Sequence, residues 1–594
     1  MELPGLERSR TLVALAVAVA AAVVLACATG LASAATTVTR SATAAKSTTT
    51  DPNTPILVTD QNRPPKGYRL TAAKVEKIAA RSPTIVAELR RHPRATAYEY
   101  TKGSGRWQVS WFSAGKHAVE LAQVYVDDAS AKVTEAWTGF QVAWSMARGY
   151  PGAFGRRVNA LYVWIPMCIL FVAPFLPWPR FRRKSRTWAR PTWSLLHVDL
   201  LVLLAFSISL ALFNNGTIGL STPLIYPPLL YLLARMLLLA FGRGRPRRPL
   251  RLAVPAAWLA VGVLFLVGFR VGLNVTNSNV IDVGYSGVVG ADKLTHGQNL
   301  YGHWPKDNSF GDTYGPVAYY AYVPFRAIFG WSGTWDDLPA AHAAAIAFEL
   351  LTLLGLFLLG RRIRGPTLGI VLAYAWAAYP FTLWTLSSNT NDSLVSMLLV
   401  FALLAIGSAP GRGVLAALAG LTKFIPLLLA PLFLRGRGSS FPRPRSIAAY
   451  VLAYGLTVVV VMLPVLLRDN LGAFWHDSIA YQADRTSPFS IWGLWGGLGF
   501  EQHLVQGATI ALALLVAFVP RRRGVVEVAA LAAAVMIAVQ LSASYWLYSY
   551  IVWFFPLVAI ALFGSFPSRE PETLTDLLVP APEPVRSPSP AFAP

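Results

Sequence analysis

Ionisable and aromatic side chains gather in the stretch VIDVGYSGVVGADKLTHGQNLYG, residues 280–302, which follows a long apolar run. Two carboxylates, Asp282 and Asp292, stand there beside two tyrosines, Tyr285 and Tyr301. A positioned carboxylate can remove a proton from a reacting hydroxyl as a general base. The tyrosines offer rings for stacking and hydroxyls for hydrogen bonds, and the glycines let the backbone approach a ligand closely. This polar loop is the first candidate site.

Two cations stand out from the others because of where they lie. Lys423 is in the middle of the apolar stretch 411–434, and Arg485 lies in the polar segment HDSIAYQADRTSPFSIWG. An ammonium inside an apolar run is costly, which makes Lys423 a functional candidate by default. Arg485 can bind phosphate through two parallel hydrogen bonds, or it can be an ordinary interfacial anchor.

A third polar group, SSNTND, ends in Asn391 and Asp392. The amide and the carboxylate could bind a polar ligand. Asp392 could equally cap the helix that follows, since Asn and Asp favour that position. Both readings stay open at this point.

The composition places all these groups in a membrane protein. Of the 594 residues, 54% are hydrophobic and 14% charged, and the mean hydropathy is +0.47. A soluble chain carries about 25% charged residues. The net charge of +23 comes largely from arginine clusters between apolar runs, which is typical of cytoplasmic loops. A nucleic-acid partner is therefore not expected. The clusters lie at 180–190, 243–251, 361–364 and 521–523.

Apolar runs long enough to cross hydrocarbon predict a polytopic all-α protein with about 11–12 transmembrane helices. Two apolar stretches, 314–330 and 411–434, cannot cross completely without placing arginine clusters outside, so we expect them to be interfacial or re-entrant. Lys423 then approaches the same outer face as the three polar loops. The spans are expected near 157–177, 194–213, 222–241, 252–271, 341–360, 366–384, 393–409, 446–467, 503–520, 524–543 and 545–563.

The two ends of the chain are different in kind. Residues 1–35 are typical of a signal peptide or signal anchor, and residues 564–594 predict a disordered, proline-rich cytoplasmic tail. Residues 36–155 should be exported, with a helix over 70–91 packed on a small antiparallel sheet. The closing sequence VYVDDASAKVTEAWTG resembles a PepSY-like domain, which implies a binding or regulatory module. A passive exported domain is the alternative.

The order of motifs in the membrane region resembles glycosyltransferase family 87, whose members are mannosyltransferase-like enzymes of the GT-C fold. The loop spacing Asp282-x-x-Tyr285, then Gly297-x-x-Leu300-Tyr301, then Tyr314-x-Pro316, is similar to the family's first outer loop. GLTKFIPLLLAPLFL is similar to its Lys-x-x-Pro segment, and NTND and QADRTSPFSIWG fit related members. The resemblance covers about residues 252–563 and leaves 156–251 as additional transmembrane helices.

This resemblance implies a sugar, mannose- or arabinose-like, passing from a polyprenyl-phosphate donor to a glycan or glycolipid hydroxyl. It implies that the site lies on the extracytoplasmic face of the plasma membrane. Asp282 would be the general base of an inverting reaction, and Lys423 and Arg485 would bind the donor phosphate. The chain has no Asp-x-Asp pair, so we expect no obligatory metal and no cofactor. The expected substrate-binding residues are Tyr285, Tyr301, Tyr314, Asn391, Asp392 and Gln482.

Two other classes of protein remain possible on the sequence alone. A transporter or flippase of lipid-linked sugars should show symmetric repeats and ionisable groups near the membrane midplane. A membrane sensor built on the exported domain leaves the polar outer loops unexplained.

Overall fold

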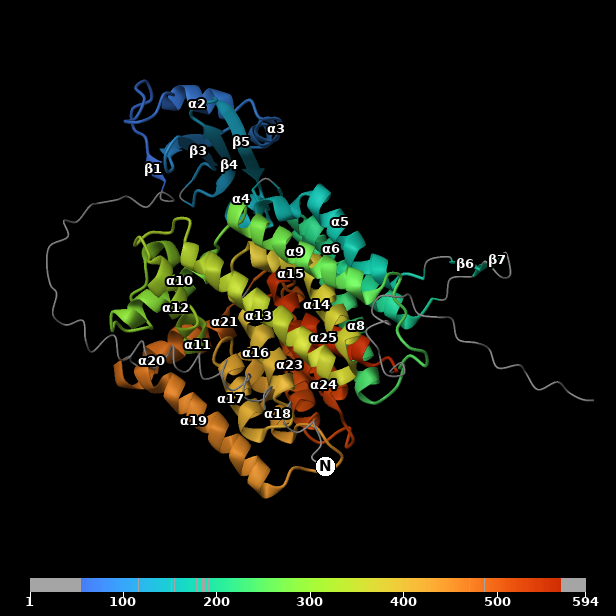
Figure 1. Ribbon diagram of the computed structural model, residues 1–594. Coiled ribbons are helices and arrows are strands. Elements are labelled where there is room, and N and C mark those ends of the chain that lie inside the picture. The colour runs from blue at the N-terminus through green and yellow to red at the C-terminus, as the bar shows by residue number, and fades with distance from the viewer. Residues whose placement is uncertain are drawn as a thin grey trace, which may run out of the picture.

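The structure is a computed structural model that describes residues 55–567, apart from residues 116, 151, 154, 178–179, 183–186, 190–192, 469–470 and 486. The predicted signal segment and nearly all of the predicted tail lie outside the described residues. Figure 1 shows a small α+β domain, drawn in blue, at one end of a large helical bundle.

The α+β domain is an antiparallel sheet with two helices on one face. The helices α2 (Ala72–Ala79) and α3 (Pro83–Arg91) bury Val75 and Ile85 against sheet residues such as Trp107. The predicted sheet is confirmed. The single helix expected over 70–91 is wrong, because the chain restarts at Pro83, a residue suited to the first turn of a helix. The strands lie in the order β1 (Ile56–Leu57), β2 (Thr96–Thr101), β3 (Arg106–Phe112), β4 (Glu120–Asp127) and β5 (Lys132–Thr138).

Among the described residues, six helical segments are long and apolar enough to cross a membrane. The pair α14 (Pro366–Ala378) and α15 (Pro380–Ser387), bent by 58°, makes a seventh if it counts as one span. The chain is therefore a polytopic α-helical membrane protein with a small α+β domain, as predicted. The six are α6 (Leu195–Asn214), Ile218–Ala240 with α7 (Ile218–Ser221) and α8 (Tyr226–Ala240), α9 (Ala256–Thr276), α13 (Pro339–Arg364), α19 (Pro444–Arg468) and α24 (Val525–Ser542).

The other four predicted spans correspond to shorter helices. The thirteen residues of α16 extend about 20 Å, less than the roughly 30 Å of bilayer hydrocarbon. Both α16 and α25 are buried along their whole length, so neighbouring helices surround them. The described residues therefore contain fewer helices of spanning length than the sequence predicted. The short helices are α5 (Leu161–Val172), α16 (Asp392–Leu404), α23 (Gly499–Leu515) and α25 (Ile551–Gly564).

The apolar stretch 411–434 folds back on itself. It forms α17 (Ala409–Gly420), a break, a 3-10 turn at Ile425–Leu429, and α18 (Ala430–Arg435). Arg412, near the start of α17, donates hydrogen bonds to the carbonyls of Phe433 at 2.5 Å and Leu434 at 3.2 Å. Both ends of the stretch thus lie at the same level, and Lys423 lies in the break between them. The folding back is what a re-entrant segment requires, and the placement of this stretch in the membrane stays a prediction.

The bundle has two chemically distinct ends. We call the end that contacts the α+β domain the outer end; Figure 1 shows α10, α11, α12 and α20 gathered there. The stretch 314–330 contributes only short helices to it. Arginines gather at the opposite end, which we call the arginine end. There Arg362 donates a hydrogen bond to the carbonyl of Leu404, and Arg435 donates one to the carbonyl of Arg521. The short outer helices are α10 (Asp282–Thr295), α11 (Pro316–Tyr320), α12 (Val323–Phe329), α20 (Leu471–Phe474), α21 (Tyr481–Asp484) and α22 (Ile491–Leu494).

The re-entrant geometry predicts that residues 435–445 face the cytoplasm. A Ser440→Cys variant, made without Cys27 and Cys168, should resist an impermeant thiol reagent in intact cells. A Ser104→Cys variant is the matched control, because Ser104 lies exposed in the α+β domain and should react readily. Rapid labelling at position 440 in sealed cells would contradict the arrangement.

Candidate active site

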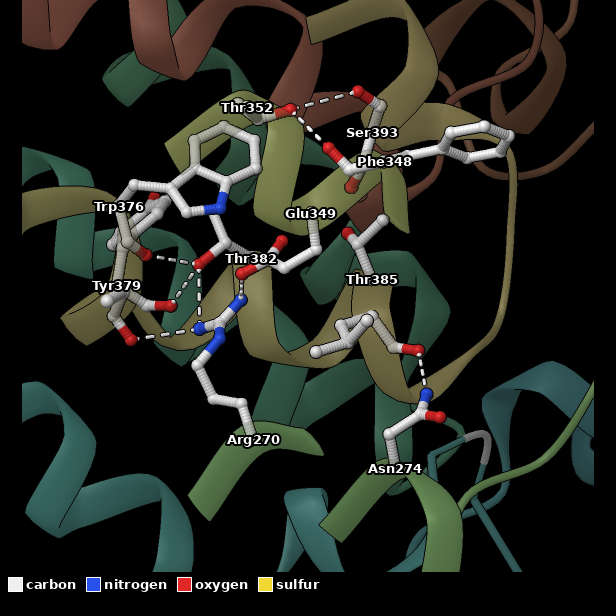
Figure 2. Close-up of polar contacts among 12 residues, drawn as sticks. Arg270, Asn274, Phe348, Glu349, Thr352, Trp376, Tyr379, Thr382, Thr385 and Ser393 are labelled. Atoms are coloured by element: carbon white, nitrogen blue, oxygen red, sulfur yellow. Dashed lines mark hydrogen bonds and ion pairs between the residues drawn. The ribbon is translucent and has the colours of Figure 1, made fainter. Parts of the chain in front are cut away.

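A buried ion pair holds the bend between α14 and α15. Arg270 of α9 lies with Nη2 2.5 Å from Oε1 of Glu349 of α13, and the two side chains are 1% and 2% exposed (Figure 2). Arg270 Nη1 also donates to the carbonyl of Ala377 at 2.9 Å and to Thr382 Oγ1 at 3.1 Å. Pro380 cannot donate a backbone hydrogen bond across the bend. The arginine and the threonine therefore satisfy groups that a continuous helix would pair.

The same face of α9 fixes the loop after α15. Asn274, one turn beyond Arg270 and labelled in Figure 2, donates to the carbonyl of Leu386 and to Asn389 Oδ1, both at 2.7 Å. Asn389 has φ of +53°, a conformation that asparagine tolerates better than most residues. The amide of Ile281 donates to the carbonyl of Ser388 at 3.3 Å. The loop 280–302 and the SSNTND loop are thus joined next to Asp282.

Lys423 is paired with Asp392. Its Nζ lies 3.3 Å from Asp392 Oδ1 and 4.4 Å from the ring centre of Tyr314. The same Oδ1 accepts a hydrogen bond from Trp553 Nε1 at 2.9 Å. Asn391 occupies the N-cap position of α16, so the capping reading of Asp392 is wrong. The carboxylate instead compensates a buried ammonium, which unpaired would be strongly destabilising.

Asp282 is the first residue of α10 and is solvent-exposed. Although solvent reaches this residue, the surrounding protein partly desolvates its carboxylate, and this raises the pKa of Asp282 above its ordinary value. The Val283 backbone N–H, Arg485 and Lys423 act in the opposite direction, and Asp392 adds to the increase. The carboxylate therefore lies within electrostatic reach of both predicted phosphate-binding cations.

Arg485 lies directly after α21. Its guanidinium carbon is 3.6 Å from the ring centre of Tyr545 and 5.8 Å from that of Tyr481. One turn earlier, Gln482 Nε2 donates to the carbonyl of Thr313 at 3.3 Å. Since Thr313 precedes Tyr314, this bond brings the segment HDSIAYQADRTSPFSIWG against the chain next to Tyr314.

Six of the nine predicted site residues thus meet at the outer end. They come from five separate segments, and the re-entrant break supplies one of them. The six are Asp282, Tyr314, Asp392, Lys423, Gln482 and Arg485.

The three other predicted substrate-binding residues do not reach an open surface. The Tyr285 ring stacks on Trp335 with centroids 4.8 Å apart, and Tyr301 packs edge-on against Phe474 at 5.0 Å. Both tyrosines are at most 2% exposed, so the predicted stacking on a sugar does not fit this structure. Asn391 is 1% exposed, and among the described residues neither of its amide atoms has a hydrogen-bond partner.

Asp292 lies apart from the cluster. It is also on α10. Its Oδ1 is 2.9 Å from Arg326 Nε and 2.5 Å from Arg326 Nη2, and its side chain is only 17% exposed. Asp292 therefore ties α10 to α12.

Sequence reasoning missed three aromatic residues of the cluster, all near the start of α25. The ring of Tyr545 lies against the guanidinium of Arg485, and Trp553 donates a hydrogen bond to Asp392. Tyr550 stacks on Trp553 with ring centroids 4.2 Å apart. Tyr550 also interacts electrostatically with Asp282 and Arg485. The available signal was the concentration of Trp and Tyr at a predicted membrane interface.

Comparison with known proteins assigns the class. The sequence model of glycosyltransferase family 87 matches residues 313–562. The match supports a glycosyltransferase family 87-like membrane protein and indicates a glycosyltransferase. It includes Tyr314 and every later residue of the cluster, whereas Asp282 precedes it. No curated protein matches the chain. The PepSY-like assignment of the α+β domain stays a prediction.

The buried ion pair gives a direct test of how the bend is held. Arg270→Met should destabilise the protein by about 3–5 kcal/mol, because Glu349 is left as an uncompensated buried charge. The double variant Arg270→Met, Glu349→Met should recover part of this loss. Thermal unfolding in detergent measures both, and a single variant as stable as the wild type would contradict the structural role.

Proposed function

We propose that this protein transfers a sugar from a polyprenyl-phosphate donor to a hydroxyl of a glycan or glycolipid acceptor on the extracytoplasmic side of the membrane. The observation that carries the proposal is the convergence of Lys423, Arg485 and the carboxylate of Asp282 at the outer end. The family 87 match to residues 313–562 supports the reaction class. The site lies beside membrane helices, which suits a donor whose lipid tail stays in the bilayer.

The two cations are suited to the donor phosphate. The guanidinium of Arg485 lies over the ring of Tyr545, and a guanidinium has five N–H groups, some of which can donate to phosphate oxygens. Lys423 adds a compact positive charge, and we propose that Asp392 acts indirectly by holding that ammonium in place. Charge accumulates on the phosphate as it leaves, so fixed cations lower the barrier.

Asp282 is the proposed general base. The acceptor oxygen forms a bond to the anomeric carbon, while the bond from that carbon to the phosphate oxygen breaks and the phosphate keeps the electron pair. The acceptor proton passes to Asp282. Attack opposite the leaving group inverts the anomeric configuration. Desolvation of Asp282 raises its pKa and so increases its proton affinity, which favours proton transfer near neutral pH.

Two further side chains are accessible for substrate contacts. Tyr314 is half-buried beside Lys423, and Gln482 is exposed next to Arg485. We propose that they bind the sugar or the acceptor, and that the sugar is mannose- or arabinose-like. Transfer by this route needs only lipid-linked donor, acceptor and the protein's own charges, so we propose that no metal takes part.

The general-base assignment predicts a specific loss of turnover. Asp282→Asn keeps the side-chain shape but removes the basicity, so transfer should fall by about a hundredfold or more while donor binding is retained. Asp292→Asn is the matched control on the same helix, and its effect should be much milder. Radiolabelled transfer by purified protein measures both variants. Near-normal turnover of Asp282→Asn would show that another group is the base.

The phosphate assignment predicts a loss at the donor. Arg485→Ala and Lys423→Ala should each weaken donor use by roughly ten- to a hundredfold, because a charge-assisted hydrogen bond contributes about 1.5–3 kcal/mol. Arg468→Ala is the control, since Arg468 is an exposed cation at the end of α19. Donor titrations at saturating acceptor measure the effect. Unchanged donor kinetics in both site variants would remove these cations from the phosphate site.

A further inference from the structure

The last part of the α+β domain packs against the segment that follows Arg485. The short helix α4 (Phe140–Ala143) is followed by Trp144, and the rings of Phe140 and Trp144 stack with centroids 6.0 Å apart. Both meet Phe489 edge-on, at 6.1 Å and 5.0 Å. Phe489 is 2% exposed. The domain thus supplies two walls of the aromatic pocket that encloses Phe489.

Phe489 leads directly to the proposed phosphate site. Its ring centre lies 6.1 Å from that of Tyr545. The guanidinium carbon of Arg485 lies 3.6 Å from the same Tyr545 ring centre. Met146 adds a second connection, since its sulfur lies 3.9 Å from the Tyr545 hydroxyl. Only two aromatic rings, Phe489 and Tyr545, separate Trp144 from the guanidinium.

The segment that bears these residues is fixed to the sheet of the domain. Arg148 Nη2 donates to Gln123 Oε1 of β4 at 2.6 Å, and its Nε donates to the carbonyl of Gln141 at 2.8 Å. Arg148 is 6% exposed. Because one buried arginine bonds both the sheet and α4, a movement of the sheet is passed to Phe140 and Trp144.

The chain after α4 also contacts the segment that leads to Asp282. Arg156 Nε donates to Asn279 Oδ1 at 2.6 Å, and the Arg157 amide donates to Asn277 Oδ1 at 3.0 Å. Both asparagines lie just before Asp282 in the chain. Residues 140–157 therefore contact the segment before the proposed base as well as the one after Arg485.

We infer that residues 140–157 set the position of Arg485, with Trp144 as a positioning residue that acts through Phe489 and Tyr545. The α+β domain is then part of the frame of the donor site, and whatever binds or displaces the domain changes how the donor phosphate is held. The expected change in donor kinetics rests on the proposed function of Arg485. The expected change in the position of Arg485 does not depend on that function.

The kinetic experiment compares Trp144→Ala with the conservative Trp144→Phe. Misplacing a binding group by about 1 Å can cost a hundredfold, so Trp144→Ala should raise the donor KM by about ten- to a hundredfold, with the acceptor KM little changed. Trp144→Phe should recover most of the loss. Trp258→Ala is the control, because Trp258 is 68% exposed on α9 and should have wild-type kinetics.

A double-mutant cycle separates positioning from general damage. Once Arg485 is replaced by alanine, Trp144→Ala should cause no further loss, since coupled residues are non-additive. Two losses that simply multiply would overturn the inference. Phe140→Ala provides a second variant of the same pocket if Trp144→Ala fails to fold.

A labelling measurement tests the position of residue 485 without any donor. In protein lacking Cys27 and Cys168, the reaction of Arg485→Cys with a thiol reagent should change several-fold when Trp144→Ala is added, and should return towards its original rate with Trp144→Phe. An unchanged rate in both backgrounds would overturn the positional inference. A changed rate together with an Arg485→Ala variant of normal donor KM would leave the positional inference standing and refute the phosphate role.

Discussion

The bilayer interior offers no hydrogen-bond partners, so the protein itself must satisfy the backbone wherever a helix is interrupted within it. Two interruptions among the described helices show how this is done. At the bend before Pro380, Arg270 and Thr382 supply the missing donors, and Glu349 balances the buried charge. At the break that contains Lys423, the ammonium pairs with Asp392. The pair of Lys423 and Asp392 also places a cation at the outer end, where it can interact with a substrate.

Both interruptions serve the same geometry. The bend directs α15 towards the loop that carries Asp392, and Asn274 fixes that loop beside the segment before Asp282. Arg270 and Glu349 are buried ionisable groups of the kind that a transporter would be expected to use. They are instead enclosed and committed to the bend, with exposures of 1% and 2%. The accessible side chains of the candidate site, among them Asp282 and Gln482, lie at the outer end, as a transferase working at a membrane surface requires.

Much of this arrangement was predictable from local chemistry. Counting arginines on each side of the membrane predicted that 411–434 is re-entrant, and the cost of a charge among apolar residues singled out Lys423. The same rule applied to Arg270, which lies in an expected span and was overlooked. Sequence spacing could not show that the rings of Tyr285 and Tyr301 face the interior, because the packing of α10 and of the loop after it places them. Nor could it show that α16 is enclosed by other helices, since that depends on packing between distant segments.

The central claim is transfer from a lipid-phosphate donor at the outer end. It is tested most directly with purified protein in vesicles of known orientation, supplied with radiolabelled polyprenyl-phosphate mannose or arabinose and membrane-impermeant glycan acceptors. The account predicts that label reaches the acceptor only when the acceptor is added on the side of the α+β domain. The transferred sugar should have inverted anomeric configuration, and nucleotide sugars should not replace the lipid donor. Transfer from a nucleotide sugar to an acceptor on the side of the arginine end would contradict it.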